Sequence, residues 1–197
     1  MKRKLWIVVI ALVILAGWRH WALNKSYQSL FPDSEIKQFP MREWVPFEKD
    51  FLDYGSSAEG YSLRADSLEL ISTEEAKERW GVDPDQEIGA GERMAVVTVT
   101  LKGQSEETGV MLTDLLLHTG DVNAMMNWDL LVAANPVLAG NYGILLPEER
   151  ELELYLPFSL TAVLFRKSTW DHMERETFYL KLTSYPTVKE IVIPGTA

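Results

Sequence analysis

A run of uncharged residues near the N-terminus constrains this chain more than any other feature of the sequence. The fourteen residues from Leu5 to Trp18 carry no charge, and they follow three consecutive basic residues, Lys2, Arg3 and Lys4. A helix built from this run would be apolar on all faces, so a soluble domain would have to bury it completely. A basic segment followed by an apolar run is instead the layout of a secretory signal or a membrane anchor. The sequence therefore predicts a targeting segment and a separate body.

We predict that residues 1–23 form an uncleaved signal anchor, a single transmembrane helix that contacts the membrane through residues 5–23. With Arg19 and His20 snorkelling toward water, this helix is about 28 Å long, close to the roughly 30 Å of a bilayer core. Small residues do not stand at the spacing of a cleavage site. A cleaved signal is therefore a less favoured alternative, and a buried helix of a soluble domain is the least favoured. The basic residues before the span place the N-terminus in the cytoplasm and the C-terminal domain outside.

The body of the chain is strongly acidic. The whole sequence has a formal net charge of −10, but its first 23 residues hold four basic and no acidic side chains, which leaves −14 on the rest. This charge argues against a nucleic-acid partner, because phosphate contacts need clustered Lys and Arg. Anionic lipid headgroups would also repel the body, so we expect it to stand off the membrane. The absence of cysteine excludes disulfides, a thiolate metal site and a cysteine nucleophile.

Composition divides the rest of the chain into a linker and one folded domain. Residues 24–42 are polar, contain two prolines and show no sustained periodicity, so we interpret them as a stalk or linker. Residues 43–197 are predicted to consist mostly of short strands. In Glu151–Phe158 apolar and polar side chains alternate, although Pro157 indicates an edge strand or a break. The predicted strands are residues 63–70 with a bulge near Asp66-Ser67, 94–101, 110–117 as a buried central strand, 151–158, 160–165, 178–183 and 188–193.

These strands predict a mainly β fold, an immunoglobulin-like antiparallel β-sandwich with one short inserted helix after the N-terminal transmembrane helix. Ser72 is the predicted N-cap of the inserted helix, and Glu75 three residues later completes a capping box. Gly81 is the predicted C-terminal stop. A second, single helical turn is predicted around residues 168–173.

Three acidic side chains form the candidate metal site. Asp83, Asp85 and Glu87 alternate in the loop after the predicted helix, and calcium loops begin with oxygen ligands at alternate positions. The pattern then departs from an EF-hand, because Ile88 and Met94 stand where its glycine and bidentate glutamate belong. A weaker, irregular Ca²⁺ site is compatible with this loop, and a solvated acidic loop is the alternative.

The sequence shows no recognisable catalytic motif. It has no nucleophile elbow, P-loop, dinucleotide fingerprint or zinc-protease motif. His118 lies between Asp114 and Asp121, and His172 follows Asp171, but we interpret both histidines as solvated rather than catalytic. The tryptophans of the body are interpreted as packing residues. We therefore predict that the chain is not an enzyme.

Several segments carry a resemblance to a known group of proteins. They are Gly60–Ala65, Thr73–Glu75, Arg79–Gly81, Trp170 and Phe178–Pro186. With these motifs the chain resembles a group of uncharacterised bacterial proteins that have a membrane-anchored or lipoprotein-like leader and an immunoglobulin-like β-sandwich. The resemblance implies no activity and no site residues. Trp18 stands where the lipidated cysteine of such a leader would be, which favours attachment through the peptide itself.

Together these features predict a single-pass membrane protein with an extracytoplasmic domain. We expect this domain to bind or scaffold an unidentified protein partner at the cell envelope, through loops such as Asp83–Gly91 and Asn135–Gly143. The alternative is a module that binds a small ligand or Ca²⁺ in the acidic loop. A hydrolase that uses scattered carboxylates is the least favoured class.

Overall fold

The computed structural model describes residues 13–19, 34–51, 58–89, 91–103, 109–120, 122–138, 140–146 and 148–195. The chain divides into two units, Met1–Ser34 and Glu35–Ala197. In the first unit, residues 13–19 are helical and exposed, while the rest of the predicted anchor, residues 1–12 and 20–23, lies outside the described residues. Among the residues described, no helix is both long enough and apolar enough to cross a membrane.

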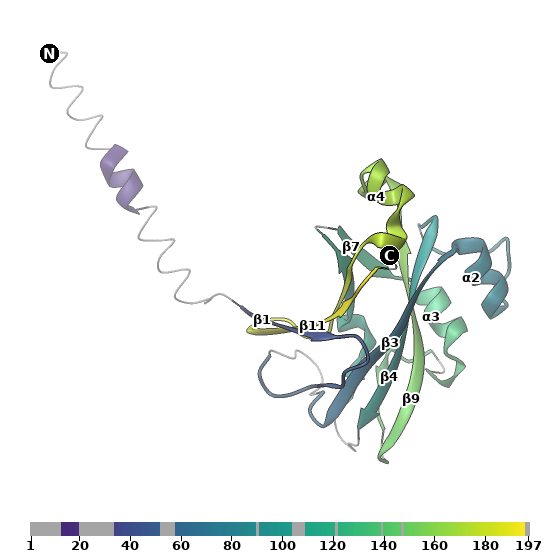
Figure 1. Cartoon of the computed structure of the whole chain (residues 1–197). Helices are drawn as coiled ribbons and strands as arrows, with labels where there is room; N and C mark the ends of the chain where they lie inside the picture. The colour runs from purple at the N-terminus through teal and green to yellow at the C-terminus, as the bar shows by residue number, and fades with distance from the viewer. Residues whose placement is uncertain are drawn as a thin grey trace, which may run out of the picture. The chain divides into compact units, whose positions relative to one another are not determined.

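The second unit is built on one large sheet of nine strands (Figure 1). The strand order is β1-β11-β10-β6-β7-β9-β4-β3-β2, and a separate two-stranded sheet pairs β5 with β8. The strands are β1 Glu35–Pro40, β2 Val45–Pro46, β3 Tyr61–Ser72, β4 Arg93–Gly103, β5 Val110–Met111, β6 Leu116–Thr119, β7 Val122–Met126, β8 Gly143–Ile144, β9 Arg150–Leu160, β10 Phe178–Lys181 and β11 Thr187–Ile193. Neighbouring strands are antiparallel, apart from β1 and β11, which are parallel.

The helices lie between strands. They are α2 Thr73–Trp80, α3 Trp128–Ala134 and α4 Lys167–Asp171, with 3-10 turns at Leu112–Asp114, Pro136–Leu138, Ala162–Leu164 and Met173–Arg175. The predicted inserted helix is confirmed as α2: Ser72 Oγ accepts a hydrogen bond from Glu75 N, and Gly81 ends the helix with φ +66°. The predicted turn around residues 168–173 is confirmed by α4 and the turn after it.

The sheet curls until its two ends nearly meet. Strand β7 pairs with β6 through Ala124 and with β9 through Met125, so the two halves of the sheet are continuous. At the other side, Met41 N donates to Val192 O and Arg42 N donates to Ala65 O, which ties β11 to β3. The prediction of a mainly β domain is confirmed. The immunoglobulin-like sandwich is not confirmed, because a single sheet surrounds the core instead of two separate sheets.

Strand β4 is buried on both of its faces. Val97, Val99 and Leu101 point into the main core inside the curled sheet. Met94 and Val96 point outward into a second, smaller core that α2 and α3 cover, together with Ile71, Ala76, Ile88 and Leu130. This double burial explains why residues 94–101 are apolar at almost every position, and it seats the two helices side by side on the outer face of the sheet.

Several predicted strands are confirmed, including the bulge, since the register of β3 against β4 shifts between Ala65 and Ser67. Others are corrected. Residues 110–117 are not one strand, because a 3-10 turn around Thr113 separates β5 from β6. Residues 160–165 are not a separate strand: Leu160 ends β9, and a 3-10 turn follows. The segment assigned to the linker contains β1, so the folded unit begins at Glu35 rather than near Glu43.

Candidate functional site

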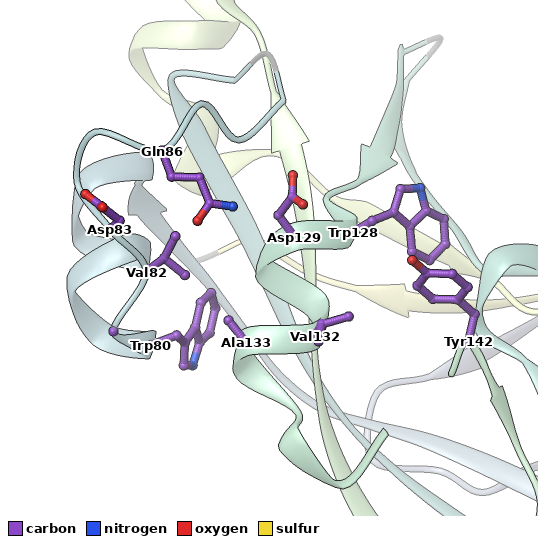
Figure 2. A pocket seen from close by; sticks show the side chains of 10 residues that line it. Trp80, Val82, Asp83, Gln86, Trp128, Asp129, Val132, Ala133 and Tyr142 are labelled. Atoms are coloured by element: carbon purple, nitrogen blue, oxygen red, sulfur yellow. The ribbon is translucent and has the colours of Figure 1, made fainter. Parts of the chain in front are cut away.

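A cavity with converging polar and aromatic side chains lies between α2 and α3 (Figure 2). Its volume is about 410 Å³. The end of α2, the loop after it, the exposed side of α3 and Tyr142 form its walls. The lining residues are Trp80, Gly81, Val82, Asp83, Gln86, Trp128, Asp129, Val132, Ala133 and Tyr142. We call this cavity the α2–α3 pocket.

The loop on the α2 side is held in place by its own hydrogen bonds. Lys77 Nζ donates to Pro84 O at 2.8 Å and to Gln86 O at 2.6 Å, so one side chain of the helix binds the loop twice. Asp83 Oδ1 accepts from Asp85 N at 2.9 Å, which closes a turn inside the loop. These bonds fix the backbone that carries Asp83 and Gln86, so this wall of the pocket exists before any ligand arrives.

Helix α3 is fixed to β9 at both ends by asparagine side chains. At its start, Asn127 Oδ1 accepts from Leu130 N, and Asn127 Nδ2 donates to Ser159 Oγ at 3.2 Å. At its end, Asn135 Oδ1 accepts from Tyr155 N at 2.8 Å and Asn135 Nδ2 donates to Tyr155 O at 2.7 Å. The Asn135 carboxamide thus replaces a strand along the part of β9 that β7 does not reach.

The pocket is electronegative. Asp83 and Asp129 line it with carboxylates, and the ten described lining residues include no lysine, arginine or histidine. The C-terminal end of α2, where the helix dipole is negative, borders the same space at Trp80 and Gly81. All three features favour a positively charged group over an anion.

Aromatic rings occupy both ends of the pocket. Figure 2 shows Trp80 beside Ala133 on one side, and Trp128 with Tyr142 on the other. The rings of Trp128 and Tyr142 meet edge to face, with centroids 5.0 Å apart. Trp80 packs partly on the small outer core but remains half-exposed. Aromatic faces attract cations, so the rings and the carboxylates select the same kind of group.

The predicted calcium ligands do not converge on one point. Asp83, Asp85 and Glu87 are all exposed in the loop, and only Asp83 lines the pocket. The described part of the chain contains no group of three or more His, Cys, Asp or Glu side chains that could hold a metal ion. The Asp83 carboxylate already accepts a backbone hydrogen bond from Asp85. Calcium binding stays a prediction.

The structure places His118 in a different environment from the one predicted. It lies on β6, where its Nε2 is 3.1 Å from Glu190 Oε1 and its ring stacks on Tyr179 at 5.0 Å. Gln38 Nε2 also donates to Glu190, which is only 7% exposed. Of the two predicted neighbours, Asp114 lies in a 3-10 turn and Asp121 lies outside the described residues. The cluster joins four strands on the outer face of the sheet.

Sequence reasoning missed Asp129, which belongs to no motif and to neither predicted recognition loop, whereas Asp83 and Tyr142 lie in the loops Asp83–Gly91 and Asn135–Gly143 that it named. It placed Trp128 among packing residues, and this tryptophan does pack against the main core while also lining the pocket. His172 Nδ1 lies 3.8 Å from Glu174 Oε1, and both side chains are exposed.

Comparison with known proteins places this fold in a family. No curated protein and no solved structure matched the chain. Residues 36–189 match the family model described as a domain of unknown function, DUF5028, and this match begins within β1 and ends within β11. The match covers most of the sequence, so the chain belongs to the DUF5028 family.

Proposed function

We propose that this chain is a membrane-tethered binding module of the bacterial cell envelope, and that its α2–α3 pocket binds a cationic group such as an ammonium or a guanidinium. The module performs no chemistry of its own. The observation that carries the proposal is a cavity that combines two carboxylates, a helix C-terminus and three aromatic rings without a basic residue in its lining.

The size and stiffness of the pocket support this function. Ligand sites typically have volumes of roughly 300–1,000 Å³, and the α2–α3 pocket falls within this range at about 410 Å³. Lys77 and Asn135 fix its two walls through side-chain hydrogen bonds to backbone atoms. A site that is ordered in advance loses less entropy when a ligand binds.

The tether rests on the sequence. Lys2–Lys4 followed by an uncharged run is the pattern of a signal anchor whose body faces away from the cytoplasm. Because the rest of the chain has a formal net charge of −14, it attracts cationic partners and is repelled by anionic lipid surfaces. Protease added to intact cells should remove the body and leave a membrane fragment that keeps Met1. Protection of the body would contradict the outward orientation.

Binding is tested with the full-length chain in nanodiscs made of uncharged lipid. The probe is choline, observed by saturation-transfer NMR, and the control ligand is its neutral isostere with carbon in place of nitrogen. We expect choline to bind and the isostere to bind at least about tenfold more weakly, equal to roughly 1.4 kcal/mol. Equal binding of both ligands would contradict the electrostatic part of the proposal.

Variants locate the site. Asp83→Asn combined with Asp129→Asn removes both carboxylates and should abolish the preference for the cation. Glu148→Gln, an exposed carboxylate that does not line the pocket, is the matched control and should leave binding unchanged. A parallel titration with CaCl₂ tests the alternative ligand. Calcium binding that depends on Asp85 would assign the acidic loop to an ion instead.

A further inference from the structure

We propose that a second site, distinct from the α2–α3 pocket, binds an extended polypeptide segment of a partner protein along the free edge of β3. The segment would add a strand to the sheet next to residues 67–70, with apolar side chains facing the core and basic side chains facing out. This inference does not depend on the proposed function of the pocket.

The first observation is that one side of β3 is only partly paired. Strand β4 pairs with β3 along its whole length, from Tyr61 to Ser72. On the opposite side, β2 pairs with β3 only at Ser62 and Leu63, and Arg42 N then donates to Ala65 O at 2.8 Å. Beyond Ala65, no strand of the described residues pairs with β3 on that side.

The second observation is the direction of the backbone along this edge. Ala65 turns its carbonyl away from β4, toward Arg42, so its partner Val99 also has its backbone turned away from β3. Alternation along β4 then turns Val97 and Ala95 away from β3 as well, and these residues stand opposite Leu68 and Leu70. The N–H and C=O groups of Leu68 and Leu70 therefore face the free edge, ready to pair with an added strand.

The third observation is an apolar groove beside this edge. It has a volume of about 380 Å³ and lies between β3 and the last described residues of the chain. Figure 1 shows the end of β11 close to β3, and the two strands contact each other. Leu68 and Leu70 point inward but remain half-exposed, because nothing in the described structure covers them on this side. The apolar lining residues are Met41, Leu68, Leu70, Phe178, Ile193 and Pro194.

The charge around the groove determines the kind of segment. Its described lining has four carboxylates, those of Asp66, Glu69, Glu174 and Glu176, and one basic side chain, that of Arg42. Asp66 pairs with Arg64 and Glu69 with Arg79, but the lining itself keeps an excess of negative groups. Side chains of an added strand alternate between the two faces of the sheet. Those that face the core would enter the apolar groove, and those that face out would meet the carboxylates. A second copy of this acidic chain fits less well, because like charges would meet.

The probe for this site is a capped peptide, Lys-Val-Lys-Val-Lys, added to the full-length chain in nanodiscs of uncharged lipid. Hydrogen exchange, followed by mass spectrometry with fragmentation to single residues, reports on the amides of Leu68 and Leu70. We expect this peptide to slow their exchange at least about fivefold, because it would provide the missing acceptors. Glu-Val-Glu-Val-Glu, and the lysine peptide N-methylated at each valine, should leave the exchange unchanged.

Two variants keep the proposal falsifiable. Leu68→Pro removes an edge donor that does not pair with β4, and Leu70→Lys places a charge in the groove; each should weaken peptide binding at least about tenfold. Leu164→Lys is the matched control, because Leu164 is an exposed leucine in the 3-10 turn Ala162–Leu164, away from β3. This variant should bind the peptide as the native chain does. Thermal melting identifies any variant that has not folded, and Leu70→Lys decides the question when Leu68→Pro fails.

Three outcomes would overturn the proposal. Equal binding of the lysine and glutamate peptides would show that charge does not select the segment. Unchanged binding in the folded Leu70→Lys variant would place the peptide elsewhere. Self-association that Leu70→Lys abolishes, measured by analytical ultracentrifugation in the absence of peptide, would make a second copy of the chain the occupant of the edge.

Discussion

Lys189 is the most deeply buried charged side chain among the residues described, at 1% exposure. Its Nζ lies 2.7 Å from Glu48 and 3.1 Å from Asp50, and it donates to Pro46 O at 2.9 Å. The side-chain oxygens of Asp50 are buried and receive no hydrogen bond from the described residues, so ion pairs alone balance this carboxylate. One ammonium group thereby connects β11 to the chain segment that follows β2.

Replacing this lysine should cost stability because it leaves Asp50 without its nearest cation. We expect Lys189→Met to lower the free energy of unfolding by about 3 kcal/mol, the lower end for breaking a buried pair, since Lys37 remains 3.5 Å from Asp50. Urea denaturation measures the loss. Adding Asp50→Asn to the Lys189→Met chain should restore part of the lost stability. If the losses of the two single variants simply add in the double variant, the two residues are not coupled.

Individual residues also differ in whether their role in the site can be predicted from the sequence. Ser72, Glu75 and Gly81 occupy positions that local capping rules recognise, so α2 was predictable from the ten consecutive residues 72–81. Asp129 carries no such local signal. It reaches the pocket because α3 is seated on β9, through the hydrogen bonds between Asn135 and Tyr155.

At the scale of elements, the C-terminal end of helix α3 is held to β9 by one carboxamide. Asn135 makes both hydrogen bonds that a neighbouring strand would make to Tyr155. Asn135→Ala should lower the free energy of unfolding by about 1–3 kcal/mol, because the N–H and C=O groups of Tyr155 lose the side chain that pairs with them. It should also speed exchange of the Tyr155 amide. Asn135→Asp keeps an acceptor for Tyr155 N but loses the donor to Tyr155 O. If the exchange rate of the Tyr155 amide is unchanged in both variants, Asn135 does not have this role.

Helix α2 is tied to β3 by an ion pair that responds to pH. Arg79 donates to both carboxylate oxygens of Glu69, at 2.6 and 3.0 Å, and these bonds lower the pKa of Glu69 from its usual value. A carboxyl group with a lowered pKa stabilises the fold above its unfolded pKa, and this contribution disappears as the pH falls through the folded pKa.

The native chain should therefore be more stable than Glu69→Gln near neutral pH, and the difference should shrink and vanish as the pH falls through the lowered pKa of Glu69. Urea midpoints at several pH values measure this. The effect should be small and should shrink with added salt, because the Glu69 and Arg79 side chains are 54% and 36% exposed. A difference that grows as the pH falls would contradict the assignment.

Elements differed in how well periodicity revealed them. The alternation in β9 is regular, and its apolar side chains are buried as predicted. Residues 110–117 gave a misleading pattern, because the apolar stretch serves two strands and a turn that all face the core. Helix α3 was missed since Leu130, Leu131 and Ala134 are buried on several sides, which leaves seven residues without a clear polar face.

At the scale of the whole molecule, the first strand of the domain lies where sequence composition indicated a linker. Strand β1 pairs with β11 over six positions, from Glu35 to Pro40, although most of its side chains are exposed. Exposure explains the absence of an apolar pattern. The backbone pairing, which composition does not report, is what makes this segment part of the fold.

This arrangement predicts where the chain can be shortened. A chain that begins at Glu35 keeps every strand of the large sheet and should unfold cooperatively. A chain that begins at Glu43 lacks β1 and leaves the edge of β11 bare, so it should melt at a lower temperature and aggregate more readily. Thermal melting and light scattering of the two chains test this, and equal melting temperatures would contradict it.

The parallel pairing of β1 with β11 also determines how the domain would carry a mechanical load. A pull applied at Glu35 along the axis of β1 would load the hydrogen bonds to β11 in shear, all together, rather than open them one after another. The groove beside β3 lies near the far end of β11. Tension between a membrane tether and a partner held in that groove would therefore pass through the β1–β11 ladder. Its hydrogen bonds would then determine the force that the domain withstands before β1 detaches.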